Sequence, residues 1–492
     1  MSKLKLTLLI AVLLTLVRVA IVYFEQISPG EAYFAACAAH PAPAYFDGPA
    51  GTALTVGQLE LWSSFSGRAA APVWALAATL ACFYLVRRLN SESAGFWAAM
   101  ALNALPIFNI YALRISPELP ALTFVLLGAY AGWRAFDGEK RAPLWWTLAG
   151  LLIGVAANFV YEAVVLAPAL VIFLWYSRKH RNAEGILSGV IVLAIPLLCL
   201  LPALMWNAEQ NWIPLAGGTL QTAWQFDPGG AASALWRTIY LISPVVAIGL
   251  LLVWIICGRG AGVHLRARFI FIGALPGILL GIYQIYRGED PLFFFLMATP
   301  FLLARSGELI ALMPMGHLWA RVAVLIAVVL TIPAAMKVYD EGREWPAAAA
   351  QMRKVFTQRL EEGQDNLFLI AQDAPMASVL AYYLRDDLIP PPGHPAVYVQ
   401  ASQDISNQYA LWPSYDDFIA TERPVDEFFT EQKGENPFME RDALYVTREP
   451  LDALPQAIQG AFEEVRLVDE IGGPDAERLY IYLCVNYQTL PL

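Results

Sequence analysis

The sequence is poor in charge and in cysteine. Of its 492 residues only 15% are charged, whereas 58% are hydrophobic, and the mean hydropathy is +0.50. Soluble domains carry about 25% charged residues on average, so this composition indicates a membrane protein. The five cysteines are scattered without a CxxC pair, which argues against a zinc site and against a disulfide framework. We expect them to be small, buried hydrophobic side chains.

Residues 337–492 lack a phosphate-binding glycine loop and a basic patch, and the sequence shows no internal repeat. Without the first two features, binding to nucleic acid is not expected. Transporters favour repeated halves and broken helices, and neither is evident in the sequence. A transporter is therefore the weakest of the three functions that we consider below.

Long apolar runs are present throughout the first two thirds of the chain. A membrane span needs about 20 apolar residues, and fewer where the helix is partly buried. The sequence predicts eleven such spans, at about 5–24, 69–86, 94–112, 118–135, 144–157, 160–176, 185–204, 236–257, 268–286, 291–304 and 319–336. The fifth and sixth could form one span, but Asn158 and the sidedness of the flanking charges favour two.

The basic residues that flank these spans predict an orientation. If the N-terminus is cytoplasmic, fifteen Lys or Arg lie on the cytoplasmic side and only Arg68, Arg114, Arg237 and Arg287 on the other. This bias follows the positive-inside rule. An odd number of spans then places the C-terminal part outside, in the periplasm of a Gram-negative bacterium. The N-terminal run lacks a clean small-residue cleavage site, so we interpret it as a retained span of an inner-membrane protein.

Charge divides the chain into two parts. Residues 337–492 contain 12 Lys or Arg and 27 Asp or Glu, a net charge of −15, whereas residues 1–336 carry +5. We therefore expect a transmembrane domain at 1–336, with a long outer loop at 25–68, and an extracytoplasmic α/β domain at 337–492. In the second domain the sequence predicts strands at 368–372, 396–400, 443–447 and 478–485, and helices at 345–363, 375–384 and 455–462.

Charged residues occur in four segments on the predicted outer side. The first loop carries Glu31 and Asp47, the turn ALRISPELP carries Arg114 and Glu118, and the turn IYRGEDPLF carries Arg287. The segment LMWNAEQNWIPL is the fourth. In a compact bundle these segments could converge on one outward cavity. The side chains that we expect to line it are Tyr33, Tyr45, Tyr161, Glu162, Trp206 and Asn207.

Such a cavity suits a lipid-linked substrate. Arginines such as Arg114 and Arg287 could hold a phosphate through charge-assisted, bidentate hydrogen bonds. A carboxylate could take a proton from a hydroxyl that attacks an anomeric carbon, while the apolar bundle receives a polyprenyl tail. The alternative is that these charges simply contact water at the membrane interface.

Two ionisable residues fall inside predicted spans, and such residues usually face protein or a cavity. Arg18 lies within reach of the outer interface by snorkelling, which is its simpler interpretation. Glu162 follows Asn158 and Tyr161, so it either lines the cavity or is an acid favoured at a helix start.

The motifs of this sequence, taken in their order along the chain, resemble those of the GT-C membrane glycosyltransferases. The similarity is to the bacterial relatives of protein O-mannosyltransferases and to lipid A aminoarabinose transferases. In those families the first outer loop opens with an Asp-Glu pair and continues to a Tyr-Phe-Asp-x-Pro-Pro segment, where this sequence has SPGEAYF and AYFDGPAG. The segments SPELP, AGLLIGVAANFVYEAVVLAP, WNAEQNWIPL, SNQYALW and LYIYLCVNY resemble further family segments, so the similarity covers nearly the whole chain.

The resemblance implies a GT-C fold and an inverting glycosyltransferase with a polyprenyl-phosphate sugar donor. It also implies a catalytic Asp in the first outer loop, and some relatives use a divalent metal ion. The sequence departs from the family at this loop. Gly30 replaces the first acid of the pair, Gly48 stands where relatives have Lys or His, Ala50 replaces the second proline, and Val160 replaces a lysine. No ligand cluster indicates a metal site.

These observations predict a polytopic α-helical GT-C-like protein with about eleven transmembrane helices and an external α/β domain. We expect it to transfer a sugar from a polyprenyl-phosphate donor to a lipid, glycan or protein acceptor on the outer face. Because Gly30 cannot accept a proton, Glu31 is the predicted base or acceptor-orienting group, assisted by Asp47 and Glu118. The alternative is a non-catalytic descendant that binds a lipid-linked glycan or stabilises a membrane complex.

Overall fold

The computed structural model describes residues 2–60, 64–138, 142–176, 182–215, 226–364, 367–402, 405–416, 437–471 and 478–488. The chain forms two compact units. The first, here called the helical unit, comprises Met1–Glu25 and Gly48–Tyr339. The second, the sheet unit, comprises Gln26–Asp47 and Asp340–Leu492. Residues 26–47, which we expected with the transmembrane domain, thus belong to the unit that contains the sheet.

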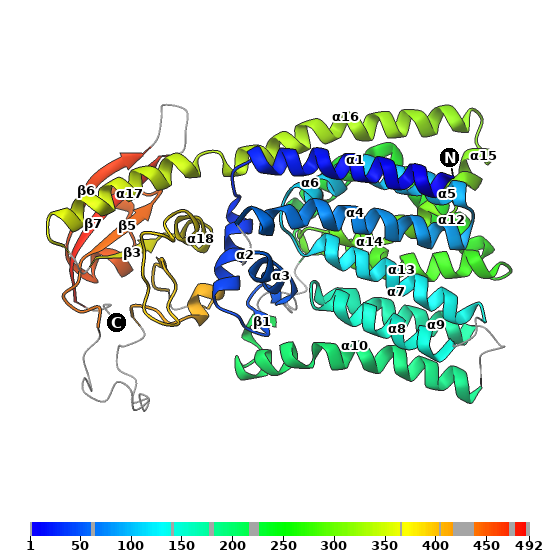
Figure 1. The fold of residues 1–492 in the computed structure, drawn as a ribbon, viewed down its shortest axis with the longest axis horizontal. Helices are drawn as coiled ribbons and strands as arrows, with labels where there is room; N and C mark the ends of the chain where they lie inside the picture. Colours follow the sequence, from blue (N-terminus) through cyan, green and yellow to red (C-terminus); the bar gives the residue numbers. More distant parts are fainter. Residues whose placement is uncertain are drawn as a thin grey trace. The chain divides into compact units, whose positions relative to one another are not determined.

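The helical unit is built from long helices, several of which (α1, α4, α7, α8, α10, α13 and α16) run side by side in Figure 1. Its first elements are α1 (Lys3–Phe24), the short strand β2 (Gly48–Pro49), α3 (Gly51–Glu60), α4 (Ser64–Leu89), α5 (Glu92–Ala104), α6 (Pro106–Leu113), α7 (Glu118–Phe136) and α8 (Ala142–Ala157). They are followed by η1 (Tyr161–Val165), α9 (Leu166–Tyr176), α10 (Ala183–Glu209), α11 (Pro228–Ile242), α12 (Pro244–Gly260), α13 (Leu265–Arg287), α14 (Leu292–Leu303), α15 (Ser306–Leu312) and α16 (Gly316–Gly342).

Among the described residues, six helices are long and apolar enough to cross a membrane, or nine if three bent pairs each form one span. Two shorter apolar helices, Ala142–Ala157 and Tyr161–Tyr176, accompany them. Each of the eleven predicted spans overlaps one of these segments. The chain is therefore a multi-pass membrane protein with an α-helical membrane part.

The predicted span 236–257 is not one continuous helix. It consists of α11 and α12, whose axes differ by 94°. The break falls at Ser243, which has a φ of 73° and precedes Pro244. A residue before proline is pushed out of the helical region of backbone space, so the helix cannot continue through this position. The predicted span 94–112 likewise contains a bend, of 71°, and a bend of 65° between α14 and α15 falls where the predicted span 291–304 ends.

Small residues let the central helices approach one another closely. On α8, a Cβ atom added to Gly154 would lie 2.7 Å from the Sγ of Cys199 on α10. One turn earlier, a Cβ on Gly150 would lie 3.2 Å from Cβ of Ile195. Without water as a competitor, such contacts are a main source of helix–helix stabilisation inside a membrane.

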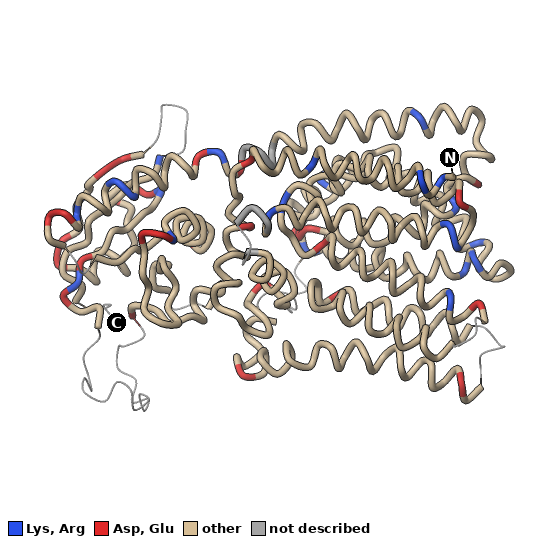
Figure 2. Tube along the Cα trace, viewed as in Figure 1, with Lys and Arg blue, Asp and Glu red and all other residues tan. Residues whose placement is uncertain are grey.

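Basic residues mark one end of the helical unit. Lys3 stands in the first turn of α1, and Arg88 and Arg134 stand in the last turns of α4 and α7. These ends are neighbours, because the Leu4 amide donates to Glu92 on α5 and Arg88 pairs with Asp137 at 3.0 Å. Figure 2 shows the Lys and Arg residues gathered where α1 begins.

The sheet unit holds a five-stranded mixed sheet in the order β4-β3-β5-β7-β6. Its strands are β3 (Phe368–Ala371), β4 (Tyr398–Val399), β5 (Ala443–Thr447), β6 (Phe462–Ile471) and β7 (Leu479–Tyr487), and β1 (Ala44–Tyr45) lies apart from it. Its helices are α2 (Pro29–Ala39), α17 (Trp345–Glu361), α18 (Ala374–Tyr383), α19 (Gln456–Gln459) and the short η4 (Gln408–Leu411) and η6 (Leu451–Ala453). All four predicted strands and all three predicted helices have counterparts, so the α/β character of this part is confirmed.

Strand β6 is the element that the sequence did not predict. It pairs antiparallel to β7 along nearly its whole length, with a register shift between Leu467 and Asp469. Most of its side chains are at least partly exposed, because it is an edge strand. Five of its ten residues are charged, which is common on protected edges and hides the apolar alternation that identifies strands.

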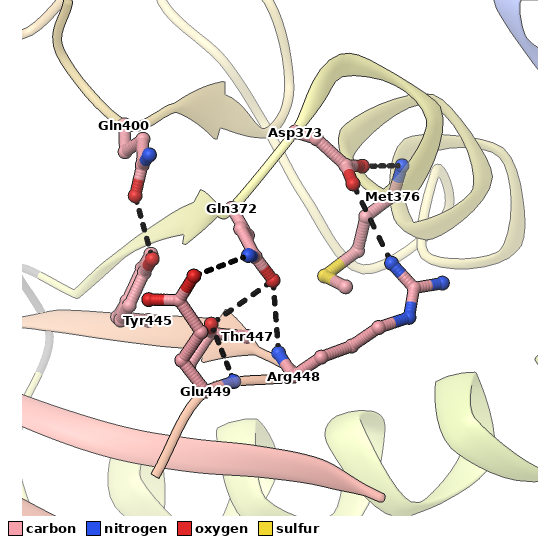
Figure 3. Close-up of polar contacts among 8 residues, drawn as sticks. All are labelled: Gln372, Asp373, Met376, Gln400, Tyr445, Thr447, Arg448 and Glu449. Atoms are coloured by element: carbon pink, nitrogen blue, oxygen red, sulfur yellow. Dashed lines mark hydrogen bonds and ion pairs between the residues drawn. The ribbon is translucent and has the colours of Figure 1, made fainter. Parts of the chain in front are cut away.

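The parallel strands β4, β3 and β5 end in a shared polar network (Figure 3). Gln372, directly after β3, accepts from the hydroxyl of Thr447 at 3.0 Å and the amide of Arg448 at 2.9 Å, and its own amide donates to Glu449. The Tyr445 hydroxyl donates to Gln400 at 2.6 Å. These groups satisfy one another, so the network fixes the ends of the strands.

The first loop is bound tightly within the sheet unit. Helix α2 packs against α18, and the amide of Phe46 donates to the side chain of Gln408 at 2.7 Å. The ring of His40 lies 4.5 Å from that of Trp412. These contacts explain why residues 26–47 belong to the same compact unit as the sheet.

Candidate functional site

Charged residues of the helical unit meet at the turn between α6 and α7. Arg114 caps the C-terminus of α6, and Glu118 is the first residue of α7. Ser116 and Pro117 between them interrupt the helix, because the residue before proline avoids helical backbone angles. Arg114 lies close enough to attract the Glu118 carboxylate, and the Ser116 hydroxyl lies beside that carboxylate. We call Arg114, Ser116 and Glu118 the turn cluster.

The turn between α13 and α14 contributes further charges. The Asp290 carboxylate lies within electrostatic range of both Glu118 and Tyr111. Arg237 of α11 also lies within electrostatic range of Tyr111. Arg237 pairs with Asp290 at 3.4 Å. The Asp290 carboxylate therefore links the second turn to the turn cluster.

Arg287, at the end of α13, is held in the interior. Its side chain is 5% exposed, its Nη2 lies 2.5 Å from Glu289 and its guanidinium lies 5.7 Å from the ring of Tyr283. Gly288 follows with a φ of 76°, the left-handed conformation that ends helices and that glycine adopts without strain. Gly288 also contacts Gly230, where an added Cβ would lie only 3.0 Å from the Gly288 Cα.

Several buried polar atoms in these two turns make no hydrogen bond of regular geometry within the part of the chain that the structure describes. They are Ser116 Oγ, Glu118 Oε2, Gln284 Oε1 and Arg287 Nη1. A buried polar group without a partner costs about 1–3 kcal/mol. Their concentration on both turns indicates a place where a polar ligand, rather than the protein, completes the hydrogen bonds.

The other predicted lining residues of the helical unit lie on η1 and on the end of α10. Asn207 is 1% exposed, and its amide donates to the hydroxyl of Tyr161 at 3.2 Å. Glu162 is within electrostatic range of Glu289 on the α13–α14 turn. Trp206 is partly buried beside Asn207. Glu162 thus connects η1 to the acids of the second turn.

An apolar groove of about 670 Å³ lies between α3 and α4. Its lining residues are Leu54, Thr55, Gln58, Leu59, Ala69, Ala70, Val73 and Trp74. Thr55, Ala70 and Trp74 also line a narrow enclosed pocket that reaches Tyr111 and Ser116. The groove and the narrow pocket are therefore neighbours, separated by these shared side chains, and the pocket borders the turn cluster at Ser116.

Glu31 has a different environment, in the sheet unit. It forms a capping box at the start of α2: its Oε2 accepts from the amide and the hydroxyl of Ser28, both at 3.0 Å, and its amide is capped by that hydroxyl. The residue is only 2% exposed. A capping box satisfies two amides at a helix start, so this carboxylate has a local structural role.

Asp47 and the two predicted tyrosines also lie in the sheet unit. The hydroxyl of Tyr33 lies beside the Asp47 carboxylate and the Cys37 thiol. Burial raises the pKa of Asp47, an effect that the neighbouring Tyr33 hydroxyl partly offsets. The hydroxyl of Tyr45 donates to the carbonyl of Cys37 at 2.8 Å, and burial raises the pKa of Tyr45 to about 12.

The structure thus divides the predicted site residues between the units. Arg114, Glu118 and Arg287 lie in the helical unit together with Tyr161, Glu162, Trp206 and Asn207, whereas Glu31, Tyr33, Tyr45 and Asp47 lie in the sheet unit. Sequence reasoning placed Asp290 among the outer charges of the turn IYRGEDPLF and Arg237 on the outer side, but it assigned no role to either residue. It did not consider Ser116.

The described residues contain no group of three or more His, Cys, Asp or Glu side chains that could hold a metal ion. A divalent ion, which some members of the resembled family use, thus has no ligand set of that size among the described residues.

Comparisons with known proteins agree with the fold. Residues 53–206 match the sequence family described as dolichyl-phosphate-mannose-protein mannosyltransferase. The apo crystal structure of ArnT from Cupriavidus metallidurans is 13% identical over 96% of this chain and 97% of that chain, with a TM-score of 0.62. The same enzyme bound to undecaprenyl phosphate is 15% identical over 98% and 99% of the two chains, with a TM-score of 0.58.

The archaeal oligosaccharyltransferase AglB from Archaeoglobus fulgidus, in complex with an inhibitory peptide and a dolichol-phosphate, is 12% identical over 77% of this chain and 63% of that chain, with a TM-score of 0.53. No protein of curated function matches the sequence significantly. The chain therefore has the GT-C glycosyltransferase fold, extended by a C-terminal sheet unit.

Proposed function

We propose that this GT-C protein transfers a sugar from a polyprenyl-phosphate donor to a hydroxyl group of an acceptor at the outer face of the membrane. The observation that carries the proposal is the buried Oε2 of Glu118, which makes no regular hydrogen bond in the described chain and lies within electrostatic range of Arg114 at the α6–α7 turn. The structures of ArnT with undecaprenyl phosphate and of AglB with dolichol-phosphate support this class of donor.

In this proposal Arg114 and Arg287 bind the donor phosphate. Arg287 is buried and has one Nη atom without a hydrogen-bond partner in the described chain, so it can donate to an anion without first losing a bond. Hydrogen bonds that involve an ionised partner contribute about 1.5–3 kcal/mol each. Arg237 and Asp290 form an exposed ion pair, which should have little effect on a bound phosphate.

Glu118 is the proposed general base, in place of the first-loop acid of the resembled family. It takes the proton of the acceptor hydroxyl while the hydroxyl oxygen attacks the anomeric carbon. The bond between that carbon and the donor phosphate breaks, and polyprenyl phosphate leaves with the electron pair. Attack from the face opposite the leaving phosphate makes the reaction inverting. The positive charges of Arg114 and Arg287 stabilise the charge that develops on the phosphate.

The groove between α3 and α4 is the proposed location of the isoprenoid chain. Leu54 and Val73 at its edge are 51% and 55% exposed, and its lining is otherwise apolar or weakly polar. The side chains that it shares with the enclosed pocket lead toward Tyr111 and Ser116. A lipid in this groove would therefore direct its phosphate toward the turn cluster.

The proposed orientation places the basic end of the helical unit in the cytoplasm. The start of α1 and the ends of α4 and α7 carry this charge, in accord with the positive-inside rule. The turn cluster then lies near the outer face of a bacterial plasma membrane, and the acidic sheet unit lies in the periplasm or outside the cell.

A second candidate is a protein that binds a lipid-linked glycan without turning it over, or that stabilises a membrane complex. The observation in its favour is that the first loop has no free acid at the position of the family's catalytic Asp, since Gly30 cannot accept a proton and Glu31 caps a helix. In this case the arginines would bind the donor phosphate, but Glu118 would not act as a base.

One experiment separates the two candidates. Purified protein in lipid nanodiscs is incubated with radiolabelled polyprenyl-phosphate sugars and membrane-extract acceptors, and both sugar release and donor binding are measured. Release that depends on Glu118 supports the enzyme. Saturable binding that Arg114→Ala or Arg287→Ala weakens, without release from any donor, supports the binding protein. Neither release nor binding would contradict both.

A further inference from the structure

The bend between α5 and α6 lies in the membrane part of the chain and leaves backbone groups to be satisfied. The two helices differ in direction by 71° around Leu105 and Pro106. Pro106 has no amide hydrogen, and the last carbonyls of α5 have no partner within their own helix. Inside a bilayer an unsatisfied carbonyl costs several kcal/mol, so a carbonyl without a backbone donor must take one from a side chain.

One side chain provides a donor at two of these carbonyls. The Nδ2 of Asn109, on α6, donates to the carbonyls of Asn103 and Leu105, both at 2.9 Å, and the Leu105 carbonyl also accepts from the backbone amide of Asn109 at 3.2 Å. The hydroxyl of Thr331 on α16 lies 3.5 Å from the Ala104 carbonyl, but its hydrogen is donated to the carbonyl of Ala327 at 3.0 Å. Asn109 thus ties the first turn of α6 to the end of α5.

Arg18 of α1 determines how the Asn109 amide is oriented. Its Nη2 donates to Oδ1 of Asn109 at 2.6 Å, and its guanidinium lies 5.5 Å from the ring of Phe108. A guanidinium only donates hydrogen bonds, so the oxygen of Asn109 must face Arg18 and the nitrogen must face the two carbonyls. Arg18 is 5% exposed. The snorkelling interpretation drawn from the sequence is therefore wrong, because the residue is buried between α1 and α6.

The direction of α6 decides where Arg114 lies. Arg114 lies eight residues beyond Pro106 at the bend, or about 12 Å along a helix. A change of about 10° at the bend would thus displace Arg114 by about 2 Å, and a misplacement of only about 1 Å can cost about a hundredfold in rate. The angle of the bend consequently determines the position of the phosphate-binding guanidinium of Arg114.

We propose that Arg18 is a positioning residue, which holds the Asn109 amide and thereby fixes the direction in which α6 delivers Arg114 to the donor phosphate. The inference rests on the proposed function for its last step. The holding of α6 is independent of that function.

The test compares Arg18→Met, Asn109→Leu and the double variant with wild type and with a control, Thr15→Val. Thr15 is a buried residue of the same helix α1 whose hydroxyl donates only to Ala11 one turn away, at 2.8 Å. Hydrogen–deuterium exchange of the α6 amides is measured in nanodiscs, together with KM for the donor, kcat and thermal stability.

We expect both single variants to raise exchange at residues 109–113 and to increase KM about tenfold, with a smaller change in kcat. Thr15→Val should change neither. In the double variant two apolar side chains replace the buried polar pair, which can be nearly neutral for stability. We therefore expect the double variant to regain stability while its KM remains raised.

Unchanged α6 exchange in Arg18→Met would overturn the inference whether or not the protein transfers sugar. Raised exchange with an unchanged donor KM, or a KM that recovers with stability in the double variant, would show that Arg18 has only a structural role. If Arg18→Met does not fold, Arg18→Lys serves in its place. If the wild type neither binds nor turns over donor, the proposed function and the role of Arg114 in phosphate binding are contradicted. Hydrogen–deuterium exchange of the α6 amides would then still test whether Arg18 holds α6.

Discussion

The acids of the first loop and the acid of the α6–α7 turn look equivalent in sequence but differ in structure. Glu31 accepts two hydrogen bonds from Ser28 and caps α2, whereas one oxygen of Glu118 is buried without a regular hydrogen bond in the described chain. Glu118 also lies near an arginine. A carboxylate whose bonding capacity is used locally stabilises the fold, and one with unused capacity is available to a ligand.

The largest effect is expected from Glu118→Gln. The substitution keeps the shape of the side chain and removes its ability to accept a proton, so turnover should fall about a hundredfold to ten-thousandfold. Donor binding should change little, because the arginines remain. Single-turnover sugar release measures the effect, and Glu162→Gln is the matched control on a neighbouring segment. Release at the wild-type rate would remove Glu118 from the mechanism.

Arg287→Ala is expected to weaken donor binding about tenfold to a hundredfold. The estimate follows from the loss of one charge-assisted bond of about 1.5–3 kcal/mol. Arg237→Ala is the comparison variant, since its exposed pair with Asp290 should contribute little. Titration with undecaprenyl phosphate distinguishes them. Equal losses in both variants would mean that Arg287 has no special role.

Gly30→Asp restores the acid of the resembled family and directly challenges the comparison between the two acids. A Cβ atom at Gly30 has no neighbour within 4 Å, so the structure has room for the side chain. Gly48 differs, because its φ of 153° would be strained in other residues. If the turn cluster performs the chemistry, turnover in Gly30→Asp should change less than about threefold. A gain of about a hundredfold, by the usual contribution of a general base, would return the site to the first loop.

The pH dependence of stability should change in Asp47→Asn. The surrounding protein raises the pKa of Asp47 in the folded state, although the residue itself is exposed, so its contribution is small, favourable at low pH and lost as the pH rises through the folded pKa. The variant should therefore gain thermal stability relative to wild type at neutral pH and lose that advantage below about pH 4, near the ordinary pKa of Asp. A gain that is the same at both pH values would contradict this assignment.

The smallest effect is expected from Glu31→Gln. The amide oxygen can still accept a hydrogen bond from Ser28, so the loss should be about 0.5–1 kcal/mol of stability, at the low end for a helix cap. Turnover should remain within about threefold of wild type. Thermal unfolding and sugar release in the same preparation provide both values. A large loss of turnover without a loss of stability would mean that Glu31 is more than a cap.

Much of the fold follows from the sequence because apolar length and strand alternation are local properties. The bend at Ser243 was not predicted, although its cause, a serine before proline, is visible in the sequence. Strand β6 was missed because its charges mask the alternation. At Ser243 and in β6 the local sequence contained a signal for the observed structure, but the same residues are also found in a continuous helix and in a polar loop, respectively.

The site was harder to predict than the fold. The resemblance ranked Glu31 first, but only the packing shows that Ser28 uses its carboxylate. The meeting of Arg114, Glu118 and Asp290 depends on turns that are about 170 residues apart in the chain. The sequence places both turns on one side of the predicted bundle but does not show which hydrogen bonds their side chains make, so the orphaned oxygen of Glu118 was not predictable.

The most direct test of the central claim is a cryo-electron microscopy structure of the protein in nanodiscs with undecaprenyl phosphate. Our account predicts phosphate density in contact with Arg114 or Arg287 and near Glu118, with the isoprenoid chain in the groove between α3 and α4. Phosphate bound without contact to either arginine would contradict it.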